Sequence, residues 1–450
     1  MKKNPRVIIM AAGQGKRWGS GYKHLCVIDG ETLLERTVRQ VKQYTDDIFI
    51  TTNTEKYKTE GAELFYPEKY TNKHEVDRFL SNRSIWGPTT VFLYGDVYYT
   101  DNAIKKIFTT SCRKYRFYGR LGESTVGGKD HAELFAVRVR DLDLFEQACK
   151  TVKGSTRNGW GWLVYRVLMG GNADISVDLL RKWLLEVKHT NFTVIDDETD
   201  DFDRKTDFMA FAQRRRDDSM FADGRIPTIS VNIMAHPSRV EMAEELSISL
   251  GGAKIIWDEI GSVGDTRRRC LLDHIEQDKD FALTVQDDCI VCEDFFERAI
   301  EFMLDIGKYA VYNFFAAEYS HDLGLFLKGV EQGYFEKNRL HNEVAFAMPT
   351  REIKSLIKYC EISDRQRDDD FNVQKYFLHN GIMIYFCVPS IVQHKDDIPS
   401  IYYRGMKPNR GAWWYVDEPN PLEGGVKYGY RKDKTGKYKR TIIGYGENKR

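Results

Sequence analysis

The sequence has no excess of charge of either sign: among its 450 residues, 67 lysines and arginines are balanced by 67 aspartates and glutamates. A neutral chain has no overall field that draws it to nucleic acid or to an anionic membrane. No apolar run approaches the roughly 20 residues that cross a bilayer. The opening MKKNPR leads directly into a strand of only about seven apolar residues, unlike a signal peptide. We therefore expect a cytoplasmic protein without a membrane span.

The eight cysteines are scattered along the chain. This indicates reduced, mostly buried thiols and argues against a zinc knuckle. Short repeats and low-complexity segments are also absent. Because domains commonly contain about 100–200 residues, a chain of this length can bury two hydrophobic cores.

Segments typical of strands and of helices alternate in the N-terminal half. Residues 6–12 form a predicted strand, and residues 32–44 carry apolar residues at helical spacing. A later strand ends on Asp96, and Asp101 is predicted to cap the helix that follows. The alternation stops in the charged segment AQRRRDDSMFADGRIP, residues 212–227, which contains an Asp-Gly turn signal and ends in proline. It restarts with TISVNIM.

This pattern predicts an α/β protein with two Rossmann-like domains, residues 1–220 and 221–400. Each is expected to be a mostly parallel mixed sheet flanked by helices. Residues 401–450 differ in composition, with 12 lysines and arginines against 5 aspartates and glutamates, a balance of +7. The aromatic residues of this extension include Trp413, Trp414, Tyr428 and Tyr430.

Basic and aromatic residues together suit an acceptor that carries phosphate, because the charges pair with a phosphate backbone and the rings stack on bases or sugars. We expect the C-terminal extension to bind such an acceptor. The alternative is a solvated tail whose aromatic residues pack on the preceding domain.

A glycine-rich loop, AAGQGKRWG, follows the first strand. Small residues let backbone N–H groups approach a phosphate, and lysine or arginine supplies the matching charge. A dinucleotide-binding GxGxxG motif is not present, because Trp18 stands in place of the third glycine; a simple glycine turn is the alternative. The predicted phosphate-binding residues are Ala11, Ala12, Gly13, Gly15, Lys16, Arg17 and Lys23.

This loop, followed by YKHL and later by YGDV, resembles the signature of the sugar-phosphate nucleotidyltransferases, the MobA-like and pyrophosphorylase superfamily. The resemblance covers about residues 5–212. It implies that Arg17 stabilises a leaving pyrophosphate, that Lys23 binds the attacked phosphate, and that the other loop residues bind the nucleotide.

The same resemblance implies a Mg²⁺ site. Asp96 in YGDV would hold the ion together with Asp201 and Asp203 in the acidic segment FTVIDDETDDFDRK, since Mg²⁺ prefers carboxylate and water oxygens. Asp196 and Asp197 are alternatives in a different register.

A second strand that ends in acid occurs in FALTVQDDCI. Asp287 and Asp288 there resemble the DxD-type motif of GT-A glycosyltransferases, which binds Mn²⁺ or Mg²⁺ and, through it, the diphosphate of a nucleotide sugar. His394 in PSIVQH would be a third metal ligand. Asp369 and Asp370 would face the acceptor, where a carboxylate can act as general base in an inverting enzyme.

Nucleotide contacts in this second domain are assigned to His236 and Arg239 in MAHPSRVEM and to Arg267 in GDTRRRC. Three consecutive arginines cannot all point into one site, so at least one of residues 267–269 is expected to face solvent.

The leading interpretation is a bifunctional enzyme that forms a nucleotide sugar from a nucleoside triphosphate and a sugar 1-phosphate, and then transfers the sugar. The acceptor hydroxyl would belong to a hydroxymethylated base of phage DNA or to a surface glycan. The alternatives are a glycosyltransferase with a nucleotide-binding scaffold domain and a nucleic-acid-binding protein without catalysis.

Overall fold

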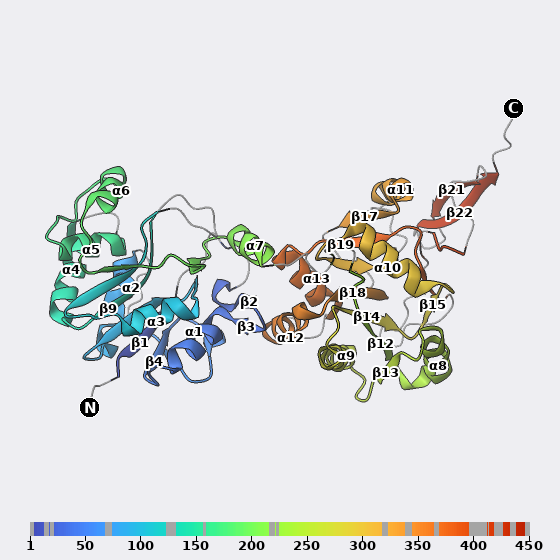
Figure 1. Ribbon diagram of the computed structural model, residues 1–450, viewed down its shortest axis with the longest axis horizontal. Coiled ribbons are helices and arrows are strands. Elements are labelled where there is room, and N and C mark those ends of the chain that lie inside the picture. The colour runs from blue at the N-terminus through green and yellow to red at the C-terminus, as the bar shows by residue number, and fades with distance from the viewer. Residues whose placement is uncertain are drawn as a thin grey trace. The chain divides into compact units, whose positions relative to one another are not determined.

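The computed structural model divides the chain into two compact units, Met1–Arg215 and Arg216–Arg450 (Figure 1). The described residues are 4–12, 18, 22–67, 74–122, 132–155, 159–215, 221, 225–316, 323–337, 344–363, 369–395, 412, 414–417, 426–432 and 438–445. Each unit is built around its own seven-stranded sheet with helices against it. The predicted α/β fold class is therefore confirmed.

The sheet of the first unit has the strand order β10-β8-β9-β6-β1-β4-β5, and every strand except β9 runs in the same direction. Its strands are β1 (Arg6–Met10), β4 (Ile48–Thr51), β5 (Glu63–Phe65), β6 (Thr90–Tyr94), β8 (Tyr115–Arg120), β9 (Glu133–Val139) and β10 (Phe192–Val194). All five residues of β6 are buried, as expected for a central strand covered on both faces.

The helices of the first unit are α1 (Leu33–Lys42), α2 (Glu75–Ser81), α3 (Asp101–Thr109), α4 (Leu142–Ser155), α5 (Gly161–Leu168), α6 (Val177–Glu186) and α7 (Lys205–Arg214). Helix α1 begins where predicted, because Thr32 and Glu35 form a reciprocal capping box. The prediction that Asp101 caps α3 is wrong. Thr100 is the cap and accepts a hydrogen bond from Ala103, while Asp101 accepts from Gln40 at 2.7 Å.

The sheet of the second unit has the order β13-β12-β14-β18-β16-β19-β17, in which only β18 and β17 run against the others. Its strands are β12 (Ile229–Ala235), β13 (Lys254–Trp257), β14 (Phe281–Gln286), β16 (Val311–Asn313), β17 (Tyr334–Lys337), β18 (Ala345–Pro349) and β19 (Ile384–Cys387). Its helices are α8 (Val240–Ser249), α9 (Val263–Gln277), α10 (Phe295–Ile306), α11 (Leu323–Gln332), α12 (Ile353–Ile362) and α13 (Asp369–Asn380).

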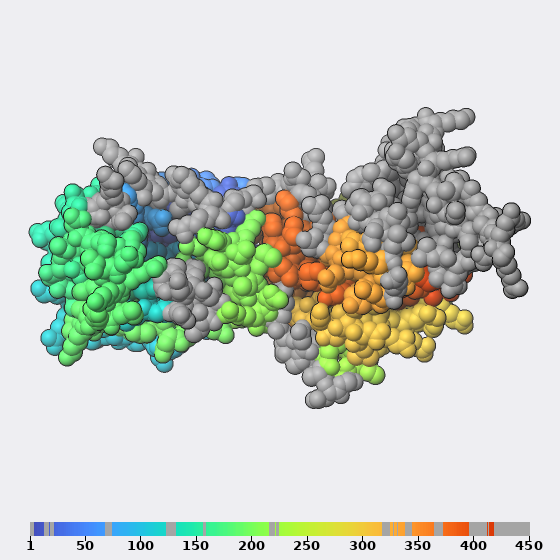
Figure 2. Space-filling view, turned by 90° about the horizontal axis from the view of Figure 1, so that it is seen from above, coloured from blue at the N-terminus to red at the C-terminus, as the bar shows by residue number. Residues whose placement is uncertain are grey.

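Two hydrophobic clusters cover the two faces of this second sheet. Alternate residues of β14 divide between them: Phe281 and Leu283 pack with α8 and α10, whereas Ala282 packs with α9, α12 and α13. Helix α10 buries Phe295 and Ala299 and turns charged residues outward, and Figure 2 shows residues of this part of the chain at the surface of the unit.

Both units follow the same plan. In each sheet the first strand lies between the strand of that sheet that follows it in the chain and the strand that ends in acid, β6 or β14. On the far side of the acid-bearing strand comes one reversed strand, β9 or β18, and then two strands in the common direction. Each unit also has a small antiparallel pair. It joins β7 (Val97–Tyr98) to β11 (Asp200–Asp201) in the first unit, and β15 (Cys289–Val291) to β20 (Val392–His394) in the second.

Part of the C-terminal segment belongs to the second unit. Ala412 and Tyr415 are buried in the cluster that includes α8 and α10, and Tyr415 forms a bridge with Ser390. The alternative in which aromatic residues pack on the domain therefore holds for Tyr415. Two further strands, β21 (Val426–Lys432) and β22 (Tyr438–Tyr445), pair with each other as a separate antiparallel ribbon.

The eight cysteines are all free thiols, and six of them are buried, as predicted. Cys289 and Cys292 stand in a C-x-x-C spacing, but both lie in the hydrophobic cluster on the α8 and α10 face, and burial raises the pKa of each thiol. Within the described part of the chain, no helix is long and apolar enough to cross a membrane.

Candidate functional sites

Asp96 lies directly after the buried strand β6, at its carboxyl end, and forms an ion pair with Lys23. Lys23 comes from a short 3-10 helix, Lys23–Leu25, that follows β1 and the glycine-rich loop. Burial acts to raise the pKa of Asp96, but the charge of Lys23 and the hydrogen bond that it donates, together with the charge of Arg78, hold that pKa well below its usual range. The structure thus brings together two residues that the sequence analysis selected separately.

His24 lies beside this pair and was not selected from the sequence. Its ring is buried, and Nδ1 is 2.9 Å from the hydroxyl of Tyr57. Burial lowers the pKa of His24 to about 3, so the ring is neutral at physiological pH. Its neighbour Lys23 is therefore the charged partner of Asp96.

Gly95 is confined by its neighbours. A Cβ atom there would lie 3.0 Å from the carbonyl oxygen of Met10 and 3.1 Å from both Ala11 Cβ and His24 Cδ2. This close approach explains why glycine precedes the acid in the YGD sequence. It also holds the ends of β1 and β6 together, which positions Asp96 next to the loop after β1.

The late acidic segment returns to Asp96 through the small ribbon. Asp201 on β11 pairs with Val97, and the N–H of the next residue, Phe202, donates to the carbonyl of Asp96 at 3.0 Å. Besides burial, the carboxylates of both Asp96 and Asp201 raise the pKa of the Tyr99 hydroxyl, so the two acids lie near the same buried tyrosine. Asp203 follows two residues later and is partly exposed.

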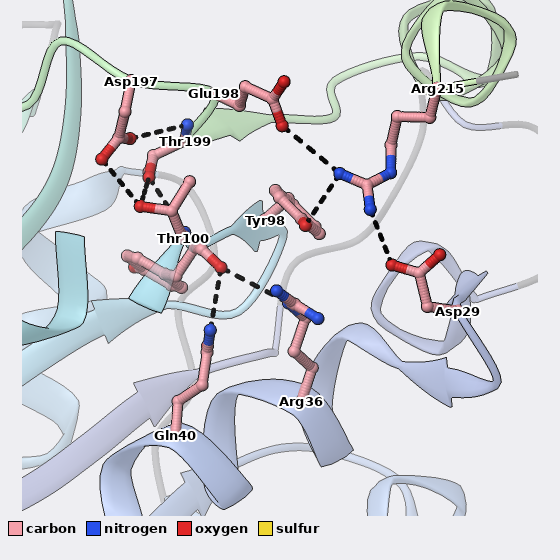
Figure 3. Close-up of polar contacts among 10 residues, drawn as sticks. Asp29, Arg36, Gln40, Tyr98, Thr100, Asp197, Glu198, Thr199 and Arg215 are labelled. Atoms are coloured by element: carbon pink, nitrogen blue, oxygen red, sulfur yellow. Dashed lines mark hydrogen bonds and ion pairs between the residues drawn. The ribbon is translucent and has the colours of Figure 1, made fainter. Parts of the chain in front are cut away.

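Asp196 and Asp197, the alternatives to Asp201 and Asp203 in a different register, both contact neighbouring side chains of the first unit. Asp197 accepts hydrogen bonds from the Thr100 hydroxyl at 2.7 Å and from the Thr199 N–H at 3.0 Å, as Figure 3 shows. Asp196 pairs with Lys106 at 2.9 Å on the surface. These contacts fix the segment that precedes β11.

Arg215, directly after α7, contacts the segment before β11 and two other parts of the first unit. Its guanidinium donates to Asp29 at 2.8 Å, to the Tyr98 hydroxyl at 3.2 Å and to Glu198 at 3.3 Å (Figure 3). The segment with Asp201 is thus tied to the core on both sides of β11.

Among the described residues, the one group of three acids whose oxygens lie within 4.8 Å of one another consists of Glu133, Asp200 and Asp201. Two of these acids already have a cation. Arg120 donates to Glu133 at 2.7 Å and to Asp200 at 2.9 Å, and all three side chains are buried. Glu133 and Asp200 therefore each form an internal ion pair with Arg120. Asp201 is the member of the group that pairs with Val97, next to Asp96, in the ribbon.

Three residues of the glycine-rich loop, Ala11, Ala12 and Trp18, lie among the described residues. Ala11 and Ala12 are buried where β1 ends, whereas Gly13, Gly15, Lys16 and Arg17 lie outside the described residues. Trp18, in place of a third glycine, is buried with Phe202 and with Phe208 of α7, whose ring centroid is 6.2 Å away. The end of the loop is thereby packed against the segment that carries Asp201.

In the second unit, Asp287 and Asp288 occupy the place that Asp96 has in the first, directly after β14. Both are almost fully buried, at 4% and 5% exposure. One nitrogen of Arg239, Nη1, donates to Asp287 Oδ1 at 2.8 Å and to Asp288 Oδ2 at 2.7 Å. The backbone N–H of His236 donates to Asp287 Oδ2 at 2.8 Å.

His394 comes from β20, the partner strand of β15, and is 3% exposed. Its Nδ1 lies 2.9 Å from the carbonyl oxygen of Lys395, which can only accept, so Nδ1 carries the proton in the neutral ring. Nε2 then has a lone pair, yet it lies 3.1 Å from the Asp288 carboxylate. Two acceptors at this distance require a cation or a proton between them.

The donor set at this position fits a divalent cation. Asp288 Oδ1 and His394 Nε2 are buried and have no hydrogen-bond partner, and carboxylate oxygen and imidazole nitrogen are common ligands of such metals. Burial acts to raise the pKa of both acids. It prevails at Asp287, whereas a proton on His394 Nε2, donated to Asp288, and the charge of Arg239 keep the pKa of Asp288 below its usual value.

The other residues selected in this unit are more dispersed. Arg267 on α9 is buried, and Arg268 is the exposed member of the arginine run, 3.7 Å from Glu361. Asp369 and Asp370 are the first residues of α13, and their side chains lie outside the described part of the structure.

A comparison with protein families finds one match, which lies in the first unit. Residues 7–79 match the model of the MobA-like NTP transferase domain. This match supports the nucleotidyltransferase part of the sequence interpretation and includes Lys23 but not Asp96. The search of curated proteins found no match.

Two solved structures show limited likeness. One, assigned as a glucose-1-phosphate thymidylyltransferase from Bacillus anthracis, is 14% identical, with 47% of this chain and 96% of that chain covered and a TM-score of 0.32. The inositol-1-phosphate CTP transferase of T. maritima is 11% identical, with 41% and 98% covered and a TM-score of 0.29.

Proposed function

We propose that the chain is a bifunctional enzyme whose first unit makes a nucleotide sugar and whose second unit transfers the sugar. The observation that carries this proposal is an arrangement that occurs in both units. A buried strand ends in acid, a two-stranded ribbon returns Asp201 or His394 to that acid, and a cation comes from the segment after the first strand. The MobA-like match over residues 7–79 supports nucleotidyl transfer in the first unit.

In the first reaction, an oxygen of a sugar 1-phosphate attacks the α-phosphate of a nucleoside triphosphate, and pyrophosphate leaves. Lys23 would bind the attacked phosphate and Arg17 the pyrophosphate, because phosphoryl transfer depends mainly on positioning and charge neutralisation. Asp96, Asp201 and Asp203 would hold Mg²⁺, which neutralises phosphate charge when bound. His24, neutral and packed between Gly95 and Tyr57, positions Lys23 at the strand end.

In the second reaction, an acceptor hydroxyl attacks the anomeric carbon of the nucleotide sugar, and a nucleoside diphosphate leaves. Asp287, Asp288 and His394 would hold Mn²⁺ or Mg²⁺, which stabilises the charge on the departing diphosphate when bound. His236 and Arg267 would contact the nucleotide. Asp369 or Asp370 would accept the hydroxyl proton in an inverting reaction.

The charge distribution favours a polyanionic acceptor. Residues 426–445, which include the β21–β22 ribbon, contain seven lysines and arginines and one aspartate, a balance of +6 (7 − 1). Because the whole chain is neutral, the remaining residues carry −6. A two-stranded ribbon has dimensions that fit the major groove of DNA, so we place a hydroxymethylated base in phage DNA ahead of a surface glycan as acceptor.

The test is a two-step assay on the full-length protein. Nucleoside triphosphates, Mg²⁺ and a panel of sugar 1-phosphates should give pyrophosphate together with a nucleotide sugar detected by its mass. Addition of hydroxymethylated or unmodified DNA, or of glycan, should then shift the mass of one acceptor by one sugar. If pyrophosphate is never released with any sugar phosphate, the first activity is wrong. Turnover of a supplied nucleotide sugar alone would favour a glycosyltransferase with a scaffold domain.

A further inference from the structure

Arg239 lies between Asp287 and Asp288, the two acids that would hold a divalent cation. A single nitrogen of its guanidinium contacts one oxygen of Asp287 and one of Asp288, at 2.8 and 2.7 Å. The arginine side chain is only 10% exposed. This differs from the sequence interpretation, in which Arg239 contacts the nucleotide.

The arginine neutralises the pair incompletely. It leaves Asp288 Oδ1 and His394 Nε2 buried without hydrogen-bond partners, and an unsatisfied buried acceptor costs free energy. A divalent cation would satisfy both atoms and carries twice the charge. The arrangement with arginine therefore resembles a resting state of the site.

The position of Arg239 in the chain also allows its side chain to move away from the two acids. It ends the short 3-10 helix Pro237–Arg239 and is the first residue before α8, in the segment that follows β12. The first unit has the same relation: Lys23, in the segment after β1, pairs with Asp96. In both units the cation that balances the acid thus comes from the chain segment beside the site.

We propose that Arg239 is a resident counterion that exchanges partners: a divalent cation takes Asp287 and Asp288, and the released guanidinium binds the diphosphate of the ligand. The proposal rests on the metal site proposed for the second unit. Arginine suits both states, because its planar fork pairs with carboxylates and with phosphates alike.

The experiment measures Mn²⁺ binding by electron paramagnetic resonance and pyrophosphate binding by calorimetry. The full-length protein carries Asp96→Asn to weaken the first site, and binding that is lost on further Asp288→Asn replacement is assigned to the second site. Arg239→Gln should bind Mn²⁺ alone on the order of tenfold more tightly, because a competing positive charge is gone. In the presence of Mn²⁺ it should bind pyrophosphate about tenfold more weakly, because a charge-assisted contact is lost.

The decisive feature is that the affinities for Mn²⁺ and for pyrophosphate change in opposite directions. Arg298→Gln is the matched control, since Arg298 also pairs with an acid, Asp294 at 2.7 Å, but on the surface of α10; it should change neither affinity. If Arg239→Gln does not fold, Arg239→Lys should show the same two signs with smaller amplitude. If both affinities stay unchanged, or Mn²⁺ binds more tightly without loss of pyrophosphate binding, the exchange is refuted while the metal site stands. If no Mn²⁺ binding depends on Asp288, the exchange and the proposed metal site both fail.

Discussion

His394 places its Nε2 atom 3.1 Å from Oδ2 of Asp288, although 106 residues separate the two in the chain (394 − 288). The ribbon brings them together, because the N–H of Lys395 donates to the carbonyl of Asp288 at 2.8 Å. The first unit repeats this backbone contact between Phe202 and Asp96 at 3.0 Å. Asp201 is therefore the counterpart of His394, each being the residue before the donor.

Replacement of His394 by glutamine is expected to weaken Mn²⁺ binding at the second site about 10- to 100-fold, the range typical of lost orienting or ligating groups. The fold should be retained, and titration of Mn²⁺ followed by electron paramagnetic resonance measures the change. His379→Gln is the control, because His379 contacts Tyr359 on the α12–α13 side. Equal affinity in the His394 variant and the parent would show that this histidine is not a ligand.

Gly95→Ala should destabilise the first unit by about 1–3 kcal/mol, as overpacking usually does. The added methyl group meets the carbonyl of Met10 at 3.0 Å, and backbone cannot move aside easily. Gly122→Ala is matched to it, since nothing lies within 4 Å of the new Cβ atom and the residue is exposed. Urea unfolding compares the two variants, and equal stability would contradict the close approach at Gly95.

Arg120→Met tests whether Glu133 and Asp200 serve as ion-pair partners of Arg120 or belong to a metal site. Removal of the arginine leaves two buried carboxylates without their cation, so the unfolding free energy should fall by about 3–5 kcal/mol. Added Mg²⁺ or Mn²⁺ should not restore it if the group is structural. Full recovery of the melting temperature with either ion would instead identify these acids as metal ligands.

The second unit should lose stability in mild acid through His274. This side chain is fully buried, with Nδ1 2.7 Å from the Ser230 hydroxyl, and burial lowers its pKa to about 4. Below pH 6.5 the unfolded state binds a proton that the folded state excludes, so stability present above that pH is lost as the pH falls toward 4. The loss between pH 7.5 and 5.0 should be roughly 2 kcal/mol.

His274→Gln should reduce this loss, which denaturant unfolding at the two pH values measures. His24 acts in the same direction in the first unit, so the transition of the second unit has to be followed separately. An unchanged pH dependence in the variant would assign the acid sensitivity to another group.

The sequence predicted those parts of the fold and sites that depend on local pattern. A buried strand that ends in acid is visible in YGDV and VQDDC, and the helical spacing of apolar residues over residues 32–44 correctly predicts α1, Leu33–Lys42. Where two neighbours could play the same role, the tertiary structure decided. Thr100 caps α3 because Asp101 is taken by Gln40 on α1.

Side-chain contacts between residues that are far apart in the chain could not be predicted from local sequence patterns. Arg239 and Asp287 are 48 residues apart, and only the parallel arrangement of β12 and β14 brings the segment after one strand to the acid after the other. Arg120, which neutralises Glu133 and Asp200, lies on a different strand from both. Tyr415 looked like part of a basic tail, yet its ring is buried in the second unit.

The central claim is that the chain has two separate reactions on its two acid sites. The most direct measurement follows pyrophosphate release and sugar transfer in parallel for Asp96→Asn and Asp288→Asn. We predict that Asp96→Asn lowers pyrophosphate release about 100-fold or more while a supplied nucleotide sugar is still transferred, and that Asp288→Asn does the reverse. Loss of both activities in each variant, with both proteins folded, would contradict the account.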